Sequence, residues 1–160
     1  MAHVVADVDT TASPERVIDA LTDFSPRRLE LWPNIDRKYF SVSTVGKLSA
    51  QATEGSAGFG GIWERARYDW SRPGIVRIDV QDSNAFQPGS YWVYEVTPGA
   101  NGGSHVRMEF DRRPRNLKGV LVSTVLSLFG RKFFSKSLRD TLRRVESAIQ
   151  PPPSEGQKST

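Results

Sequence analysis

The amino-acid sequence predicts an α+β fold in which a curved, seven-stranded antiparallel sheet wraps around one long C-terminal helix. Strand-like alternation occupies residues 2–9 and returns between residues 39 and 112, with two short helix patterns between these regions. A long helical pattern then runs from about residue 115 to residue 150. The links between successive strand patterns are short, which favours antiparallel hairpins over parallel strands. We expect such a sheet and helix to enclose a cavity.

The N-terminal elements follow from local signals. Residues 2–9 alternate between apolar and polar side chains, as in a strand with one buried face. Ser13 followed by Pro14 is a typical helix start, because serine caps free backbone N–H groups and proline fits the first turn. A second short helix is predicted to begin after Ser25 and to end before Pro33, since proline cannot continue a helix.

The central region predicts a meander of strands. Glycine and proline punctuate it into strand patterns at about 39–48, 50–55, 61–71, 74–82, 90–97 and 104–112. The glycine-rich segment 58–61 resembles a phosphate-binding loop only superficially, because no helix follows it. We interpret it as a turn at the mouth of the cavity.

Glu64 is the most informative single residue of the meander. It shares the inward phase of its strand with Ile62, Ala66, Tyr68 and Trp70. A carboxyl group on an apolar face would have a raised pKa, so Glu64 is a candidate acid/base group or ligand anchor. Two alternatives remain: an ion pair with Arg65 or Arg67, or a register error of one residue, which would reverse the two faces.

The predicted C-terminal helix has two different halves. In the second half, one stripe of apolar residues should pack across the sheet: Phe134, Leu138, Leu142, Val145 and Ile149. The first half, residues 117–134, is apolar on nearly every side. A straight helix over the whole pattern would be about 50 Å long, so we expect a bend near Gly119 or Gly130. We predict one domain, residues 1–150, and a disordered tail, residues 151–160.

The apolar segment 117–134 has several possible roles. It is flanked by basic residues and is interrupted by Ser123, Thr124 and Ser127, which argues against a membrane span. It could form a lid over the cavity, a dimer contact or a surface that touches a membrane. The alternative is a helix simply covered by the domain's own loops.

The charge distribution is uneven. The net charge is +4, but residues 112–144 hold ten Lys and Arg residues and one acid, Asp140. These side chains could form a solvated helix face or attract an anionic surface or ligand. Nucleic-acid binding is not expected, because the basic residues interleave with leucine and phenylalanine that should face the core.

Composition excludes several chemistries. The chain has no cysteine, so it has no disulfide, thiolate nucleophile or thiolate metal ligand. Of its two histidines, His3 lies at the start of a strand and His105 in an outward phase, so neither predicts a catalytic triad or a metal site. The first residues enter a strand pattern directly, without a basic and apolar leader. We therefore predict a cytosolic protein without a signal peptide.

Several short motifs occur in an informative order. They are Ala12–Val17 with Leu21-Thr22-Asp23, Trp32-Pro33, the turn at Gly55–Gly60, Pro88–Trp92 and the closing helix. In this order, over roughly residues 3–149, the chain resembles the SRPBCC superfamily, also called the START-like or Bet v 1-like helix-grip fold. More narrowly, it resembles the polyketide cyclase/dehydrase and lipid-transport branch. That resemblance implies no cofactor, and it leaves ligand carriers, lipid-transfer domains, cyclases and co-chaperones open.

The leading hypothesis is binding or carriage of a small hydrophobic ligand, lipid- or polyketide-like, in an internal cavity. The candidate ligand-binding residues are Trp32, Ile62, Trp70, Ile78, Trp92, Met108, Leu121, Val125 and Phe129. The alternative is a cofactor-free cyclase or dehydratase with Glu64, Tyr68 and Tyr94 as catalytic residues. A second alternative is a protein- or membrane-interaction module that uses residues 117–134. The chain could be a monomer or a homodimer.

Overall fold

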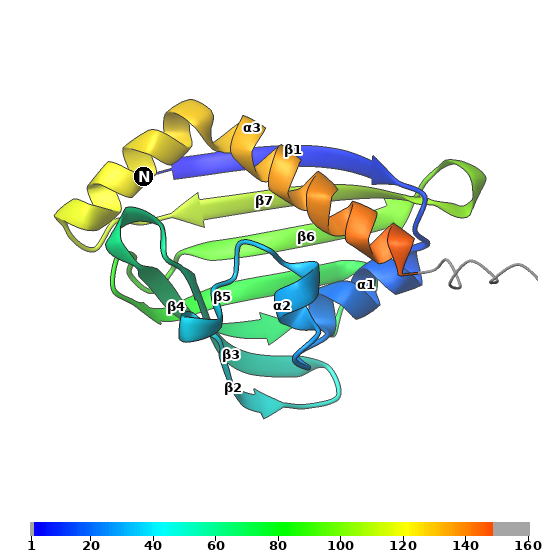
Figure 1. Cartoon of the computed structure of the whole chain (residues 1–160), viewed down its shortest axis with the longest axis horizontal. Helices are drawn as coiled ribbons and strands as arrows, with labels where there is room; N and C mark the ends of the chain where they lie inside the picture. The colour runs from blue at the N-terminus through cyan, green and yellow to red at the C-terminus, as the bar shows by residue number, and fades with distance from the viewer. Residues whose placement is uncertain (1, 149–160) are drawn as a thin grey trace, which may run out of the picture.

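The computed structural model describes residues 2–148, which form one curved antiparallel sheet with a long helix across its concave face (Figure 1). The strands are β1 (Ala2–Thr10), β2 (Ser41–Val45), β3 (Ser49–Ser56), β4 (Ile62–Asp69), β5 (Ile75–Ser83), β6 (Tyr91–Pro98) and β7 (Ser104–Arg112). The helices are α1 (Pro14–Thr22), α2 (Arg28–Leu31) and α3 (Leu117–Ser147). Short 3₁₀ turns occur at η1 (Arg37–Tyr39), η2 (Gly58–Gly60) and η3 (Ala100–Gly102).

The strand order confirms the predicted meander. Strands β2 to β7 lie side by side in chain order, and β1 pairs with β7 to give the order β1-β7-β6-β5-β4-β3-β2. Each strand is antiparallel to its neighbours. Tight turns make this arrangement possible; Gly74, for example, has a φ of +72° and lies against the Val96 carbonyl. The seven-stranded helix-grip prediction is therefore confirmed.

The main core lies between the concave face and the helices. On the sheet it uses the predicted inward phases, including Val76, Tyr94 and Phe110. From the helix side, Leu138 and Leu142 of α3 close over these residues. Helices α1 and α2 cover the part of the sheet near the C-terminal end of α3 (Figure 1). The predicted stripe on the second half of α3 is thus the packing face as far as Val145; Ile149 and the predicted tail at 151–160 lie outside the described residues.

Helix α3 is continuous from Leu117 to Ser147, and it bends partway along its length (Figure 1). Gly130 is buried where the helix passes Val4 of β1, and Gly119 is buried against the backbone of Ala85. The Asn116 side chain caps the helix by accepting a hydrogen bond from the Gly119 N–H at 3.0 Å. Within residues 2–148, no helix is long and apolar enough to cross a membrane.

Candidate functional site

Two arginine–glutamate pairs lie on the concave side of the sheet. Glu54 of β3 and Glu64 of β4 stand directly opposite each other in the strand register. Arg28 begins α2 and pairs with Glu54, whereas Arg112 ends β7 and pairs with Glu64. Both arginine side chains are almost fully buried, with 4% and 1% of their surfaces exposed. Buried charges of this kind are rare unless they are paired.

The Arg28 pair is fully satisfied. The Arg28 Nε donates to Glu54, and its Nη1 donates to the backbone carbonyls of Leu21 and Asp23 at 3.1 and 3.2 Å. The guanidinium also lies over the Phe24 ring, 4.6 Å from its centroid. Burial lowers the pKa of Arg28, but Glu54 and Tyr68 together raise it by more, so the pKa is raised overall. This pair therefore fastens α2 and the end of α1 to the sheet.

The Arg112 pair is only partly satisfied. Its Nη2 lies 3.0 Å from Glu64 Oε2, yet neither Nη1 nor Nη2 has an aligned hydrogen-bond partner among the described residues. The guanidinium lies 4.3 Å from the Trp92 ring centroid and 5.2 Å from that of Phe86. Burial lowers the pKa of Arg112 despite the nearby carboxylate. This arginine thus keeps buried N–H groups with no aligned acceptor in the described chain, which is energetically unfavourable.

Glu64 has the inward position that its strand phase predicts. Burial raises its pKa, and the opposing Glu54 adds to that effect, while the Arg112 charge acts against it. Its ion-pair partner is Arg112 rather than Arg65 or Arg67. Those two arginines lie on the outer face and pair with Asp82 and Asp69, respectively.

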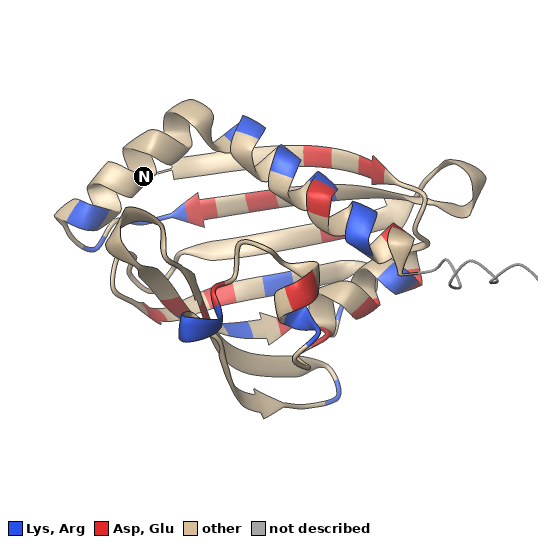
Figure 2. Ribbon diagram, viewed as in Figure 1, with Lys and Arg blue, Asp and Glu red and all other residues tan. Residues whose placement is uncertain are grey.

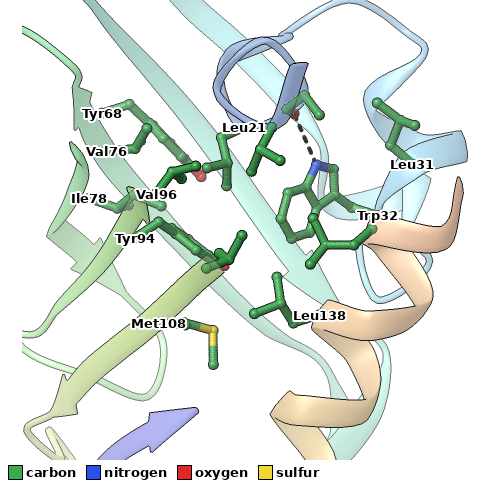
Figure 3. Close-up of a cluster of buried hydrophobic side chains, with 14 of the residues drawn as sticks. Leu21, Leu31, Trp32, Tyr68, Val76, Ile78, Tyr94, Val96, Met108 and Leu138 are labelled. Atoms are coloured by element: carbon green, nitrogen blue, oxygen red, sulfur yellow. Dashed lines mark hydrogen bonds between the residues drawn. The ribbon is translucent and has the colours of Figure 1, made fainter. Parts of the chain in front are cut away.

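Tyr68 and Tyr94 extend from the sheet toward the helices (Figure 3). Burial raises the pKa of both phenols, and Glu54 raises that of Tyr68 further. Both hydroxyls are therefore protonated at neutral pH and can donate hydrogen bonds. The three predicted catalytic residues thus share one buried region with the two arginines. The charges that shift the tyrosine pKa values are those of Glu54 and the arginines rather than that of Glu64.

Most of the predicted ligand-binding residues also meet in this core. Trp32 is buried, and its indole N–H donates to the Ala20 carbonyl at 3.3 Å (Figure 3). Ile78 and Met108 are buried beside it in the same cluster. Two further residues pack at its edge: Trp70 stacks on Phe24, and Trp92 contacts Phe110 and Phe134.

Four predicted residues lie away from this cluster. Ile62 packs against a second, smaller core formed by Ala85, Phe86 and Val122, and Val125 is half-buried. Leu121 and Phe129, in contrast, are 59% and 63% exposed. Val122 on the first half of α3 packs against Ala85 and Phe86 in the link between β5 and β6, and Leu121 lies on another side of the helix. Leu121 and Phe129 do not line the interior.

Sequence reasoning missed Arg28, Glu54 and Arg112. Arg112 was grouped with basic residues that could form a solvated helix face or attract an anionic surface or ligand, and the structure excludes a solvated position for it, because it is buried at the end of β7. The inward alternation of β7 continues through Phe110 to Arg112 and would have signalled its burial. Glu54 likewise follows the inward phase of Ala52. Arg28 lies in a helix of four residues, which is too short for any periodic signal.

Two pockets of the described chain lie at its surface. One, of about 230 Å³, lies between α1, α2 and the end of α3, and is lined by residues that include Asp19, Arg27 and Val145. The other, of about 450 Å³, lies against basic side chains of α3. Neither is lined by the buried aromatic residues. The two histidines are on the outer face, where His3 contacts Glu109 and His105 contacts Asp7 and Asp9.

Comparison with known proteins defines the family. The model of the family described as "Polyketide cyclase / dehydrase and lipid transport" matches residues 1–150, so the chain belongs to this family. No curated protein sequence matches the chain closely enough to count as a relative. The predicted superfamily is therefore confirmed by the family model and by the fold.

Solved structures share this fold at low sequence identity. The TTHA0849 protein of Thermus thermophilus aligns with a TM-score of 0.76 and 14% identity, over 92% of this chain and 99% of that one. A START superfamily protein of Mycobacterium smegmatis aligns with a TM-score of 0.73 and 15% identity, over 93% of this chain and 100% of that one. The Zhui aromatase/cyclase of Streptomyces sp. R1128 aligns with a TM-score of 0.70 and 13% identity, over 94% of this chain and 97% of that one. At such identities, these likenesses describe the architecture alone.

Proposed function

We propose that this protein binds or carries a small hydrophobic ligand whose carbonyl oxygen is held by Arg112 beside Glu64. The observation that supports the proposal is a fully buried arginine whose Nη1 and Nη2 have no aligned hydrogen-bond acceptor among the described residues, although Nη2 lies 3.0 Å from Glu64. A buried donor without an acceptor costs about 1–3 kcal/mol, and a ligand oxygen would offset that cost. The family assignment supports the same class of function.

The surroundings of Arg112 indicate the ligand chemistry. The rings of Phe86, Trp92 and Phe110 surround the guanidinium and favour a flat or extended apolar body. The Glu64 carboxylate already balances the arginine charge, so a neutral carbonyl fits better than a second anion. A lipid-like or polyketide-like ketone has both features.

Access to this site requires side chains to move, because Arg112 is 1% exposed and aromatic rings lie against its guanidinium. Trp92 is half-buried and contacts Phe134 of α3, with 5.2 Å between the ring centroids. Phe134 lies on the same helix as the bend. We propose that the ligand takes the space that opens when Phe134 moves away from Trp92 and Phe110.

The test compares two ligands that differ by one oxygen. We expect a long-chain or aryl ketone to bind at least about tenfold tighter than its methylene analogue, which corresponds to one good hydrogen bond to a charged donor. In the double variant Arg112→Met with Glu64→Gln, this preference should disappear. Arg107→Met is the matched control, because Arg107 lies on the outer face of the same strand. Equal binding of both ligands by the wild-type protein would overturn the proposal.

Cyclisation is a second candidate function, favoured by the raised pKa of Glu64 beside a buried cation. Glu64 could remove a proton from a carbon between two carbonyl groups while Arg112 holds the resulting enolate oxygen. The enolate carbon would then attack a second carbonyl, and Glu64 would return its proton to the alkoxide oxygen that forms, which gives a cyclic β-hydroxy ketone. Glu64→Gln should abolish product formation from a poly-β-ketone and leave ketone binding intact. If the wild-type protein binds this compound and returns it unchanged, it acts as a carrier.

Two finer features stay predictions. The cytosolic location rests on the sequence alone, and so does the choice between monomer and homodimer. Native mass spectrometry of the purified protein, followed by extraction of any bound small molecule, would measure the oligomeric state and reveal a resident ligand.

A further inference from the structure

The first half of α3 has a second apolar face that points to solvent. Leu117, Leu121 and Leu128 are 85%, 59% and 71% exposed, and their spacing places them on one side of the helix. Val122 lies on the other side, where it packs against Ala85 and Phe86. The outer leucines therefore contribute nothing to the core of this chain. Beyond them, Phe129 and Phe133 are also more than half exposed.

The charge around this face has one sign. From residue 113 to residue 139 the chain has seven basic residues, at positions 113, 115, 118, 131, 132, 136 and 139, and no acid. Figure 2 shows blue segments and no red one on the first half of α3. Arg131, Lys132, Ser135, Lys136 and Arg139 line a surface depression of about 450 Å³ next to the exposed phenylalanines.

Some basic side chains near this face already have partners within the chain, and others can contact an external anion. Arg115 pairs with Asp82, Lys118 donates to the Gly61 carbonyl at 3.0 Å, and Lys136 pairs with Asp140. Arg131 and Lys132 form no ion pair within the described part of the chain. They immediately follow the apolar face, as expected for side chains at the level of lipid phosphates.

We propose that the first half of α3 docks on an anionic lipid membrane. Leu117, Leu121 and Leu128 would enter the boundary between head groups and acyl chains, while Arg131 and Lys132 contact phosphate groups. The charge pattern favours this surface over a second copy of the chain. Two such helices packed together would bring basic residues against basic residues with no acid between them.

The exposed face of α3 begins a few residues after the buried Arg112. Arg112 ends β7, and α3 begins after a link of four residues, 113–116. The same part of α3 is held by Lys118 to the η2 loop, where Phe59 is also exposed. A membrane at this face would therefore lie close to Arg112. The leucines and basic residues of this face are exposed whether or not Arg112 binds a ligand.

Vesicle co-sedimentation of the full chain tests the proposal. We expect binding to vesicles of phosphatidylcholine with phosphatidylserine, and weak or no binding to phosphatidylcholine alone. Arg131→Gln with Lys132→Gln should lower the affinity at least about tenfold, since each basic residue near an anionic surface contributes about 1 kcal/mol. Leu121→Ser with Leu128→Ser should lower it by a similar factor. Added salt should lower the affinity of the wild-type protein for anionic vesicles, as the Arg131→Gln with Lys132→Gln variant does without added salt.

The control is Val45→Ser, which removes an exposed apolar side chain from β2, far from α3 in the fold. It should bind vesicles like the wild-type protein, and all variants should unfold at similar urea concentrations because the changed residues are exposed. Equal binding to neutral and anionic vesicles, or no binding to either, would overturn the proposal. A dimer in solution that Leu121→Ser dissociates would also overturn it and would identify a contact between copies instead.

Discussion

Glu54 and Glu64 face each other directly across β3 and β4, and each carboxylate is matched by a different buried arginine. Two like charges at directly opposed positions destabilise a sheet unless other groups compensate them. Arg28 supplies that compensation from α2, and Arg112 supplies it from the end of β7. The two pairs differ in completeness, because Arg28 uses its donors on the protein and Arg112 retains donors for another acceptor.

Arg28→Met should strongly destabilise the fold. It leaves the Glu54 carboxylate without its cation and removes the bonds to the Leu21 and Asp23 carbonyls. Loss of one partner of a buried pair costs about 3–5 kcal/mol, and Glu54 is 18% exposed, so the lower end is expected. Urea unfolding monitored by circular dichroism measures the change.

The matched comparison is Arg77→Met on the outer face. Arg77 pairs with Asp79 at 2.8 Å, but about half of each side chain is exposed. An exposed pair contributes at most about 1 kcal/mol. Similar losses of stability in the two variants would mean that burial does not set the strength of the Arg28 pair.

The sequence carries the architecture because each strand has one buried face. Alternation with a period of two places Glu64, Tyr68 and Tyr94 inward, and the structure has all three there. The same rule, applied to charged residues at strand ends, would have placed Glu54 and Arg112 inward as well. A charged residue next to solvent-exposed neighbours is normally assigned to the surface. For this reason Glu54 and Arg112 were not predicted to be buried.

Other parts of the site depend on contacts that local patterns do not record. The partner of Glu64 lies at the end of β7, three strands away in the sheet, so no spacing rule connects the two residues. The first half of α3 is apolar on nearly every side, so periodicity cannot tell which side faces the core. For that reason Leu121 and Phe129 were predicted to line the ligand site, although they face solvent.

Glu64 should give the protein a characteristic pH dependence. Burial raises its pKa, so the folded protein keeps this proton after the unfolded chain has lost it. The contribution of Glu64 to stability is therefore greatest below the ordinary glutamate pKa of about 4.3 and decreases as pH rises to the raised value. The difference in unfolding free energy between the wild-type protein and Glu64→Gln, measured across this range, should fall with pH and then become constant.

Glu146 should show the opposite slope. Its Oε1 accepts hydrogen bonds from the Thr10 hydroxyl at 2.6 Å and the Thr11 N–H at 3.0 Å, and the bond from Thr10 contributes most to lowering its pKa. The stability that Glu146 contributes is present above the ordinary pKa and is lost as pH falls through the lowered one. The difference between wild type and Glu146→Gln should thus rise with pH. Slopes of the same sign in both variants would contradict the assignment.

The two buried glycines of α3 should respond differently to alanine. A Cβ at Gly119 would collide with the backbone carbonyl oxygen of Ala85, which is held in place by a hydrogen bond from the Arg115 N–H at 2.9 Å. Alanine is favoured over glycine in a helix by about 1 kcal/mol, but such a collision costs about 1–3 kcal/mol. Gly119→Ala should therefore lower both the thermal midpoint and the free energy of unfolding.

At Gly130 the nearest atom is Val4 Cγ2, 3.1 Å from the point that an alanine Cβ would occupy, and this methyl group belongs to a side chain that can rotate. The gain in helix propensity should then offset most of the crowding, so Gly130→Ala should leave stability within about 1 kcal/mol of the wild type. The two variants make the same chemical change in the same helix. If both are equally destabilised, the bend near β1 depends on Gly130 itself, and the helix needs the flexibility of glycine there rather than the space.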